Sequence, residues 1–220
     1  MEVILTKQDL EAFVNRAGFL PSSGERAPFC LEKLCPNPWH TDQASDPWRW
    51  RMEIAQEGNI AYGKFFHSLS GYIAADCLPA FIALRRGGLT ARELYEDGLL
   101  GRESMALYEL LEQEGGQPAH QLKRLAGLTG KRSGRFDAAM VQLQMRLLVS
   151  ICGQTRKRNA LGQEYGWQVA CYECVERRFG QGEPLQPGQA LEALTDRACG
   201  ALAVDRQAVR ALLDPFGLAR

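Results

Sequence analysis

The stretch KRLAGLTGKRSGRFDAAMVQLQMRLLVSICGQTRKR, residues 123–158, concentrates positive charge in one part of the chain. It contains nine lysine and arginine residues and a single acidic residue, Asp137. The whole chain is formally neutral, with 26 basic and 26 acidic residues, so the stretch reflects a separation of charge and not a general bias. Such a cluster is typical of a surface that binds nucleic acid.

The hydrophobic spacing in and around this stretch predicts three helices followed by a basic hairpin. Apolar residues recur at helical intervals over residues 104–113, 119–125 and 135–145. A strand is expected at 147–151, a polar loop at 155–164 and a returning strand at 167–172. Three helices and a two-stranded wing are the elements of a winged-helix module, a fold that places a helix in a groove of DNA. The basic stretch therefore falls in the part of the chain that predicts this fold.

The rest of the chain divides around this module. Residues 7–17 predict a helix, and a proline- and tryptophan-rich irregular segment follows as far as a short helix at 51–57. Strands at 59–66 and 71–73 form a hairpin, and residues 76–86 a helix. We therefore expect an α+β protein: an N-terminal helix and β-hairpin subdomain (1–98), a winged-helix domain (99–180) packed on it, and a linker with C-terminal helices (181–220).

Composition limits the class of protein. The chain has 220 residues, 45% hydrophobic and 24% charged, which suits a globular fold with a substantial core. The first residues lack the pattern of a signal peptide, and no apolar run is long enough to span a bilayer. The seven cysteines are scattered and odd in number. We expect reduced thiols in a cytoplasmic protein with no membrane partner.

Several motifs resemble a bacterial family. They include DPWRWR at 46–51, IAYGKFF at 60–66, YEDG at 95–98, RFD at 135–137 and YGW at 165–167. Together they are similar to proteins known as AlkZ-related or as winged-helix DNA-binding proteins, over roughly residues 13–180. The resemblance implies a winged-helix architecture distantly akin to the AlkZ/YcaQ DNA glycosylases, which excise alkylated bases and unhook interstrand crosslinks.

The resemblance also suggests a catalytic candidate. Those glycosylases carry a Gln-apolar-Gln or Gln-apolar-Asp triplet, and Gln142-Leu143-Gln144 matches it as a string. In the enzymes the triplet lies near the N-terminus and precedes Asp-Pro. Here it ends a basic helix and runs into a strand, so Gln142 and Gln144 are catalytic candidates in a different setting.

The DNA-binding candidates fall into two groups. Lys131, Arg132 and Arg135 stand at the start of the third helix, where they could reach base edges or phosphates. Arg156, Lys157 and Arg158 would lie on the wing, where they could contact the backbone or the minor groove. The alternative is a solvated basic face that offsets the acidic residues of the first helix.

An aromatic group gives a further candidate site. Trp48, Trp50 and Tyr62, with Lys64, could form a slot that stacks a flipped or unpaired base. The alternative is that these aromatic residues form the core between the proline-rich segment and the hairpin.

A metal site is not expected. Cys171 and Cys174 have a Cys-x2-Cys spacing, and Cys30, Cys35 and His40 lie upstream. A structural zinc ion needs four converging ligands, and residues three apart on a strand point to opposite faces. We predict neither a metal nor a cofactor.

The favoured interpretation is a protein that binds double-stranded DNA, including damaged or distorted DNA. A DNA glycosylase-like base-excision hydrolase is the enzyme hypothesis. A non-catalytic regulatory DNA-binding protein and a protein–protein interaction module are the alternatives. The sequence leaves the oligomeric state open.

Overall fold

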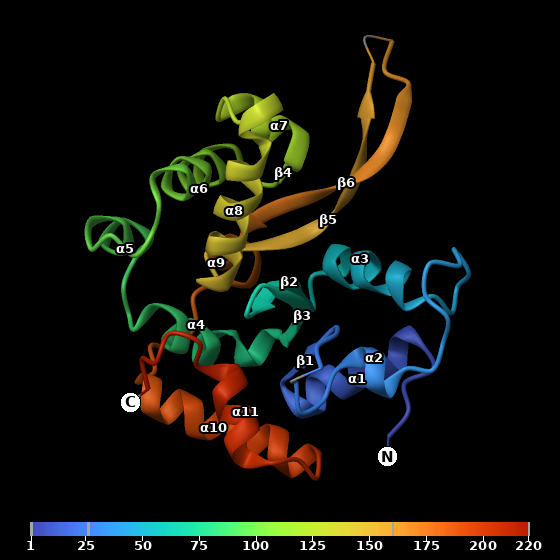
Figure 1. Ribbon diagram of the computed structural model, residues 1–220, viewed down its shortest axis with the longest axis vertical. Helices are drawn as coiled ribbons and strands as arrows, with labels where there is room; N and C mark the ends of the chain where they lie inside the picture. The colour runs from blue at the N-terminus through green and yellow to red at the C-terminus, as the bar shows by residue number, and fades with distance from the viewer. Residues whose placement is uncertain (1, 26, 160, 220) are drawn as a thin grey trace.

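A computed structural model describes residues 2–25, 27–159 and 161–219 (Figure 1). It combines helices with an antiparallel sheet, so the predicted α+β class is confirmed. The chain also ends in helices, as expected.

The described strands form one antiparallel sheet in the order β1-β3-β2-β5-β6-β4. Their bounds are β1 Phe19–Pro21, β2 Ile60–Phe66, β3 Leu69–Ala74, β4 Gln117–Pro118, β5 Val149–Arg158 and β6 Glu164–Cys174. β2 and β5 are distant in the sequence but pair at Tyr62 and Ile151. The N-terminal hairpin and the basic hairpin therefore belong to the same sheet.

Capping residues explain where the first helix begins and ends. The helix α1 (Lys7–Ala17) begins at Thr6, whose side chain forms a capping box with Asp9. It ends at Gly18, whose φ of 89° is the left-handed conformation that glycine adopts most readily.

The other helices follow the expected pattern with additions. They are α2 Leu31–Leu34, α3 Pro47–Glu57, α4 Leu78–Arg86, α5 Ala91–Glu96, α6 Arg102–Glu114, α7 Ala119–Leu125, α8 Ser133–Met145, α9 Val175–Phe179, α10 Pro187–Ala201 and α11 Arg206–Leu213, with 3-10 turns η1 Ala75–Cys77 and η2 Gly130–Arg132. α3 begins four residues before the predicted helix at 51–57, because a proline is well accommodated in the first turn. No helix in the described part of the chain combines the length and apolarity needed to cross a membrane.

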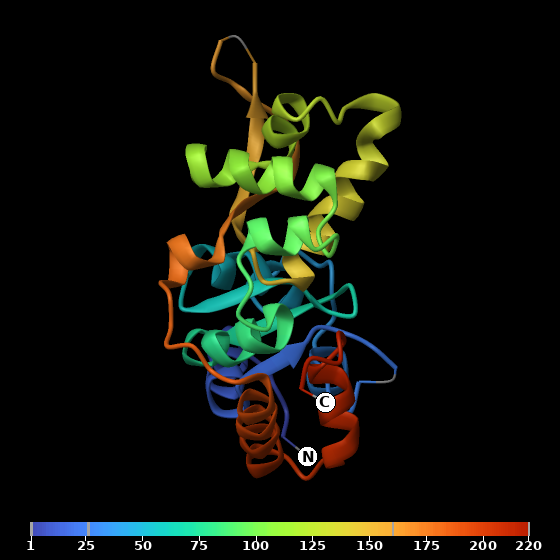
Figure 2. The same ribbon diagram turned by 90° about the vertical axis from the view of Figure 1, so that its left-hand side faces the viewer.

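Buried apolar side chains form two clusters at opposite ends of the sheet. The first joins the N-terminal elements to α10 and α11, with Phe13, Phe81 and Leu194 among its members. The second joins α5–α8 to the base of the basic hairpin, with Phe136 and Leu143 among its members. Tyr172 of β6 packs against both. Figure 2 shows the C-terminal helices in red beside the N-terminal ones, and α6–α8 at the other end with the hairpin.

Buried arginines connect the two clusters where α8 turns into β5. Arg86 donates to the carbonyl oxygens of Arg146 (3.0 Å) and Leu147, and pairs with Glu176 at 2.5 Å. Arg146 in turn donates to the carbonyl of Arg85 at 2.7 Å. Leu147 has a φ of 52°, which is costly for a residue with a branched side chain. The Arg86 bonds therefore hold a strained turn.

The basic hairpin is longer than the sequence pattern predicts. The expected loop at 155–164 is wrong, because β5 and β6 remain paired as far as Arg158 and Glu164. The outer part of the hairpin is exposed on both faces, so it carries no alternation of apolar and polar residues by which strands are detected.

Candidate nucleic-acid interface

The helix α8 buries one face and leaves its N-terminal end exposed. Phe136, Met140 and Leu143 are buried, and α8 packs against α6. Lys131 and Arg132 lie in η2, immediately before the helix, and both are exposed. The apolar spacing therefore fixes which side of α8 meets the core and leaves the basic residues in solvent.

Lys123 connects α7 to the first turns of α8. Its ammonium group donates to the hydroxyl of Ser133 at 2.9 Å and lies 3.2 Å from a carboxylate oxygen of Asp137. It also lies 4.7 Å from the centre of the Phe136 ring. These contacts position α8 relative to α7. They also engage the charge of Lys123, which belongs to the basic stretch.

The six predicted DNA-binding side chains divide into paired and unpaired cations. Arg135 forms an ion pair with Glu103, and Arg158 lies 3.4 Å from Glu164. Exposed pairs of this kind are weak and can be exchanged for a phosphate. The remaining four are exposed and form no ion pair within the described residues: Lys131, Arg132, Arg156 and Lys157.

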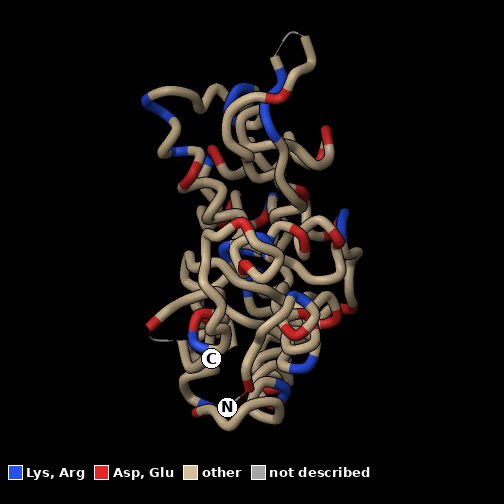
Figure 3. The backbone as a smooth tube through the Cα atoms, turned by 90° about the vertical axis from the view of Figure 1, so that its right-hand side faces the viewer, with Lys and Arg blue, Asp and Glu red and all other residues tan. Residues whose placement is uncertain are grey.

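His120 shows that α7 and the hairpin bring positive charge together. The pKa of its imidazole lies below 6.5, because burial, Lys157 and Arg124 all disfavour the protonated form. Lys157 is on β5 and Arg124 is on α7, so two elements contribute to the same positive potential. Figure 3 shows the blue segments at this end of the molecule, from the loop before α8 across α7 to the hairpin.

The hairpin also exposes large apolar side chains. It projects beyond the body of the molecule (Figure 1), with Trp167 92%, Leu161 83% and Tyr165 52% exposed. Clustered exposed apolar residues on a projecting element indicate a contact surface. Trp167 was not predicted as a site residue, because its place in the sequence suggested only a position on a strand.

Both glutamines of the predicted triplet make internal hydrogen bonds. Gln142 accepts from the backbone N–H of Gly101 (2.9 Å) and the hydroxyl of Ser104 (2.6 Å). Gln144 is buried; it accepts from the N–H of Lys64 (3.0 Å) and donates to the carbonyl of Met140 (2.8 Å). The first side chain ties α8 to the start of α6, and the second ties it to β2.

The aromatic candidates separate into core and cavity residues. Trp50 is buried, and its indole N–H donates to the carbonyl of Ala44 at 2.7 Å. Trp48 is 42% exposed and lines a cavity together with Tyr62. Lys64 is exposed and does not line that cavity. The structure therefore brings together two of the four predicted residues, and the cavity has further members that were not predicted from the sequence, including Tyr72.

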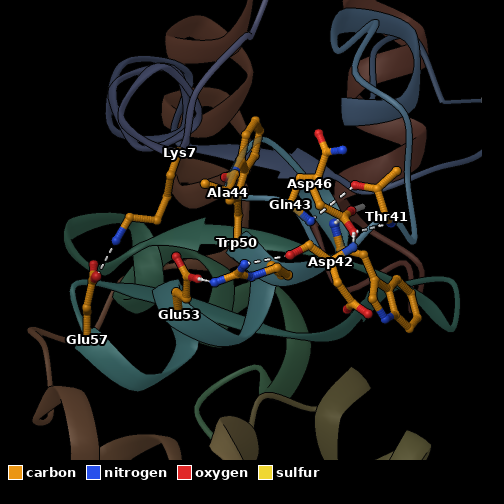
Figure 4. Close-up of polar contacts among 11 residues, drawn as sticks. Lys7, Thr41, Asp42, Gln43, Ala44, Asp46, Trp50, Glu53 and Glu57 are labelled. Carbon is orange, nitrogen blue, oxygen red and sulfur yellow. Dashed lines mark hydrogen bonds and ion pairs between the residues drawn. The ribbon is translucent and has the colours of Figure 1, made fainter.

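Asp46 holds the loop that precedes α3, the helix that carries Trp48 and Trp50 (Figure 4). Its buried carboxylate caps α3 and accepts backbone N–H bonds from His40 (3.2 Å), Thr41 (2.7 Å), Asp42 (3.1 Å) and Trp48 (2.8 Å). Desolvation raises the pKa of Asp46, but the four donors outweigh it and hold the pKa below 3.8. His40 and Asp42 have positive φ values, so the carboxylate stabilises a loop that is costly to form.

Replacing Asp46 with asparagine should lower the free energy of unfolding at neutral pH by about 2 kcal/mol, since it removes a charged cap with several donors. Because the folded-state pKa is depressed, this stabilisation is present above pH 3.8 and is lost as the pH falls through the folded-state value. Urea unfolding at a series of pH values measures this stabilisation. Asp9→Asn, which removes an exposed capping carboxylate, is the control and should lower the free energy of unfolding by less. A variant as stable as the wild type at pH 7 would contradict this role.

Comparisons with known proteins decide the family. The chain matches the family described as AlkZ related over residues 4–202. The chain belongs to the AlkZ-related family. It matches no curated protein sequence. Among solved structures it is similar to the Streptomyces sahachiroi DNA glycosylase AlkZ, with 11% sequence identity and a TM-score of 0.49. The match covers 98% of this chain but 60% of that one, so this chain spans less than two thirds of the glycosylase.

The cysteines of this AlkZ-related chain are free thiols. Cys174 is buried at the end of β6, and Cys171 is partly buried on the same strand. Burial raises the pKa of the Cys174 thiol to about 12, which keeps it protonated and unreactive near neutral pH. Within residues 2–25, 27–159 and 161–219, no three histidine, cysteine, aspartate or glutamate side chains converge as metal ligands would.

Proposed function

We propose that this protein binds double-stranded DNA through the N-terminal end of α8 and the β5–β6 hairpin, and that it recognises damaged or distorted DNA. The observation that carries the proposal is the set of exposed, unpaired cations, Lys131, Arg132, Arg156 and Lys157, on two elements at one end of the molecule. Cations in such positions neutralise phosphates and release counterions on binding. The neutrality of the whole chain means that this local charge, and not the net charge, would attract DNA.

The order of elements supports a winged-helix assignment for this region. The helices α6, α7 and α8 are followed by the β5–β6 hairpin, and β4 between α6 and α7 pairs with β6. In this arrangement α8 would be the groove-reading helix and the hairpin the wing. We place the winged-helix domain at residues 99–180, on the N-terminal subdomain 1–98, with 181–220 as linker and helical tail. Ala91 and Leu94 join the same cluster as α6–α8, so α5, at the end of the N-terminal subdomain, packs against this domain.

The exposed apolar residues of the hairpin suggest how distorted DNA would be favoured. An aromatic side chain that enters a groove or an opened base step gains stacking only where the duplex can be unstacked. Trp167 is the residue best placed for such a contact, beside Lys157 and Arg156 on the paired strand. Matched duplexes would then be held by charge, and flexible or damaged ones by charge and stacking.

A glycosylase is the enzyme alternative, and the glutamines provide its test. Gln144→Ala should lower the free energy of unfolding by about 1–3 kcal/mol, because it removes a buried side chain that bonds to the partly buried N–H of Lys64 and to the carbonyl of Met140. Gln142→Ala should have a smaller effect, because the side chain is itself less buried and its partner Gly101 is exposed. Urea unfolding measures both. We expect no base release from alkylated duplex by the wild type; release that both substitutions abolish in folded protein would establish catalysis.

A protein–protein module remains the third class of function, since α6 carries several acidic residues close to the basic end. Fluorescence anisotropy of a labelled duplex at low salt separates it from the proposed function. Saturable binding supports the DNA assignment for either a repair or a regulatory protein. An absence of binding would reject both and favour the protein–protein module.

A further inference from the structure

A small cavity opens between α3, the β2–β3 hairpin and residues 22–23. Its volume is about 240 Å³, and Trp39, Trp48, Tyr62 and Tyr72 supply aromatic walls. Tyr62 and Tyr72 are cross-strand partners whose ring centres lie 5.0 Å apart. The volume is below the range of pockets for drug-sized ligands, so a single planar ring system fits it better.

Arg51 makes the cavity selective for ligands with hydrogen-bond acceptors. Its guanidinium carbon lies 3.5 Å from the centre of the Trp48 ring, so the tryptophan supports the guanidinium plane from one side. Its Nε is shielded from solvent and has no hydrogen-bond partner among the described residues. An unpartnered buried donor is costly, and an acceptor on a bound ligand would relieve that cost.

The charge of the lining disfavours cationic ligands. The described residues that line the cavity include Arg51 and several serines but no carboxylate, so a cationic ligand would be repelled and not paired. A neutral planar ring with carbonyl or ring-nitrogen acceptors satisfies both the walls and the unpartnered donor. Nucleobases have this chemistry, and they stack on aromatic rings and on arginine planes.

The cavity adjoins the opposite end of α8 from the unpaired cations. The thioether sulfur of Met145, the last residue of α8, accepts from the N–H of Ser68, which lines the cavity. Lys64 follows Tyr62 by two residues and is exposed beside Gln144 of α8. A helix of 13 residues is about 20 Å long, or roughly six base pairs of duplex. A strand bound at the start of α8 would therefore reach the cavity with a nearby nucleotide.

We infer that the cavity walled by Trp39, Trp48, Tyr62 and Tyr72 binds one unpaired DNA base, which stacks on the aromatic walls while Arg51 donates to its acceptor edge. This inference rests on the proposed function, since the base belongs to a duplex held at α8 and the hairpin. Neither Gln142 nor Gln144 is among the described residues that line the cavity, so we assign the pocket to recognition of the base and not to its excision. It would add to the preference for distorted DNA that Trp167 of the hairpin supplies.

The test compares a duplex that carries a single-base bulge with the matched duplex without it, by fluorescence anisotropy at one salt concentration. The wild type should prefer the bulged duplex by about tenfold or more, as expected for one stacked base. Arg51→Met and Trp48→Ala should reduce this ratio towards one and leave the affinity for the matched duplex unchanged. Arg16→Met is the matched control: it removes an arginine of α1 that lies outside the cavity and away from the proposed interface, and it should leave both affinities unchanged.

Each outcome decides between the claims. Equal wild-type affinity for the two duplexes, or a ratio unchanged in Arg51→Met, overturns the base pocket and leaves duplex binding intact. Loss of binding to both duplexes in the wild type overturns the proposed function itself. If free deoxyguanosine binds as tightly as the bulged duplex and Arg51→Met abolishes that binding, the pocket serves a free nucleoside and the inference is wrong. Arg51→Met decides alone if Trp48→Ala fails to fold.

Discussion

Replacing Lys131, Arg132, Arg156 and Lys157 together with alanine should reduce affinity for duplex DNA on the order of a thousandfold at 0.1 M salt. These four cations are exposed and form no ion pair among the described residues, so their removal breaks no internal interaction of that kind. Each phosphate that is no longer neutralised should also lower the salt dependence of binding by about one unit in the log–log slope. Anisotropy titrations at several salt concentrations measure both effects.

A second quadruple variant controls for net charge. Arg16, Arg92, Arg206 and Arg210 lie away from the proposed interface, and each forms a surface ion pair. Replacing them with alanine changes the net charge by the same amount but should leave the salt slope as in the wild type. An equal decrease of affinity in the two variants would mean that DNA responds to overall charge and that the interface is misplaced.

The largest effect on stability is expected at Arg86. Arg86→Met should lower the free energy of unfolding by about 3 kcal/mol or more, because it removes a buried group that donates to two backbone carbonyls and to Glu176. Those carbonyls belong to the turn at Leu147, where the backbone is strained. Urea unfolding measures the decrease, and a broadened or two-step transition would indicate that the two clusters unfold separately.

Arg85, the neighbouring residue, provides the matched control. It is fully buried; its Nε and Nη1 lack partners among the described residues, and it donates only from Nη2, to the carbonyl of Phe65 at 3.2 Å. Burial lowers its pKa to about 9, so the charged form is poorly accommodated. Arg85→Met should therefore leave the free energy of unfolding unchanged or raise it by up to about 2 kcal/mol. If the two substitutions destabilise equally, side-chain volume and not hydrogen bonding explains the junction.

The elements that hydrophobic spacing predicted are those with one clearly buried face. The three helices before the basic hairpin follow this rule. The strand β2 is buried on both faces apart from Lys64, and its aromatic residues and the turn after it are what predict it. The strands that were missed, β1 and β4, have three and two residues, too few to show any period. The pairing of Tyr62 with Ile151 connects residues that are far apart in sequence, and no local pattern encodes it.

The candidate site likewise depends on tertiary contacts that the sequence pattern does not show. The sequence predicts Trp48 and Trp50 as one group because the prolines around them favour an irregular segment. On a helix, positions two apart point to different sides, and the structure buries Trp50 while exposing Trp48. The basic residues are evident in the sequence, but which of them are free of ion pairs depends on acidic partners such as Glu103 that tertiary packing brings near.

The salt dependence of duplex binding by the wild-type protein tests the central claim most directly. With four phosphates neutralised, the logarithm of the association constant should fall with the logarithm of salt concentration at a slope of about −3.6 or steeper. Between 50 and 200 mM salt the affinity should drop on the order of a hundredfold. A slope near zero, or no binding to duplex DNA at the lowest salt, would contradict a DNA interface at α8 and the hairpin.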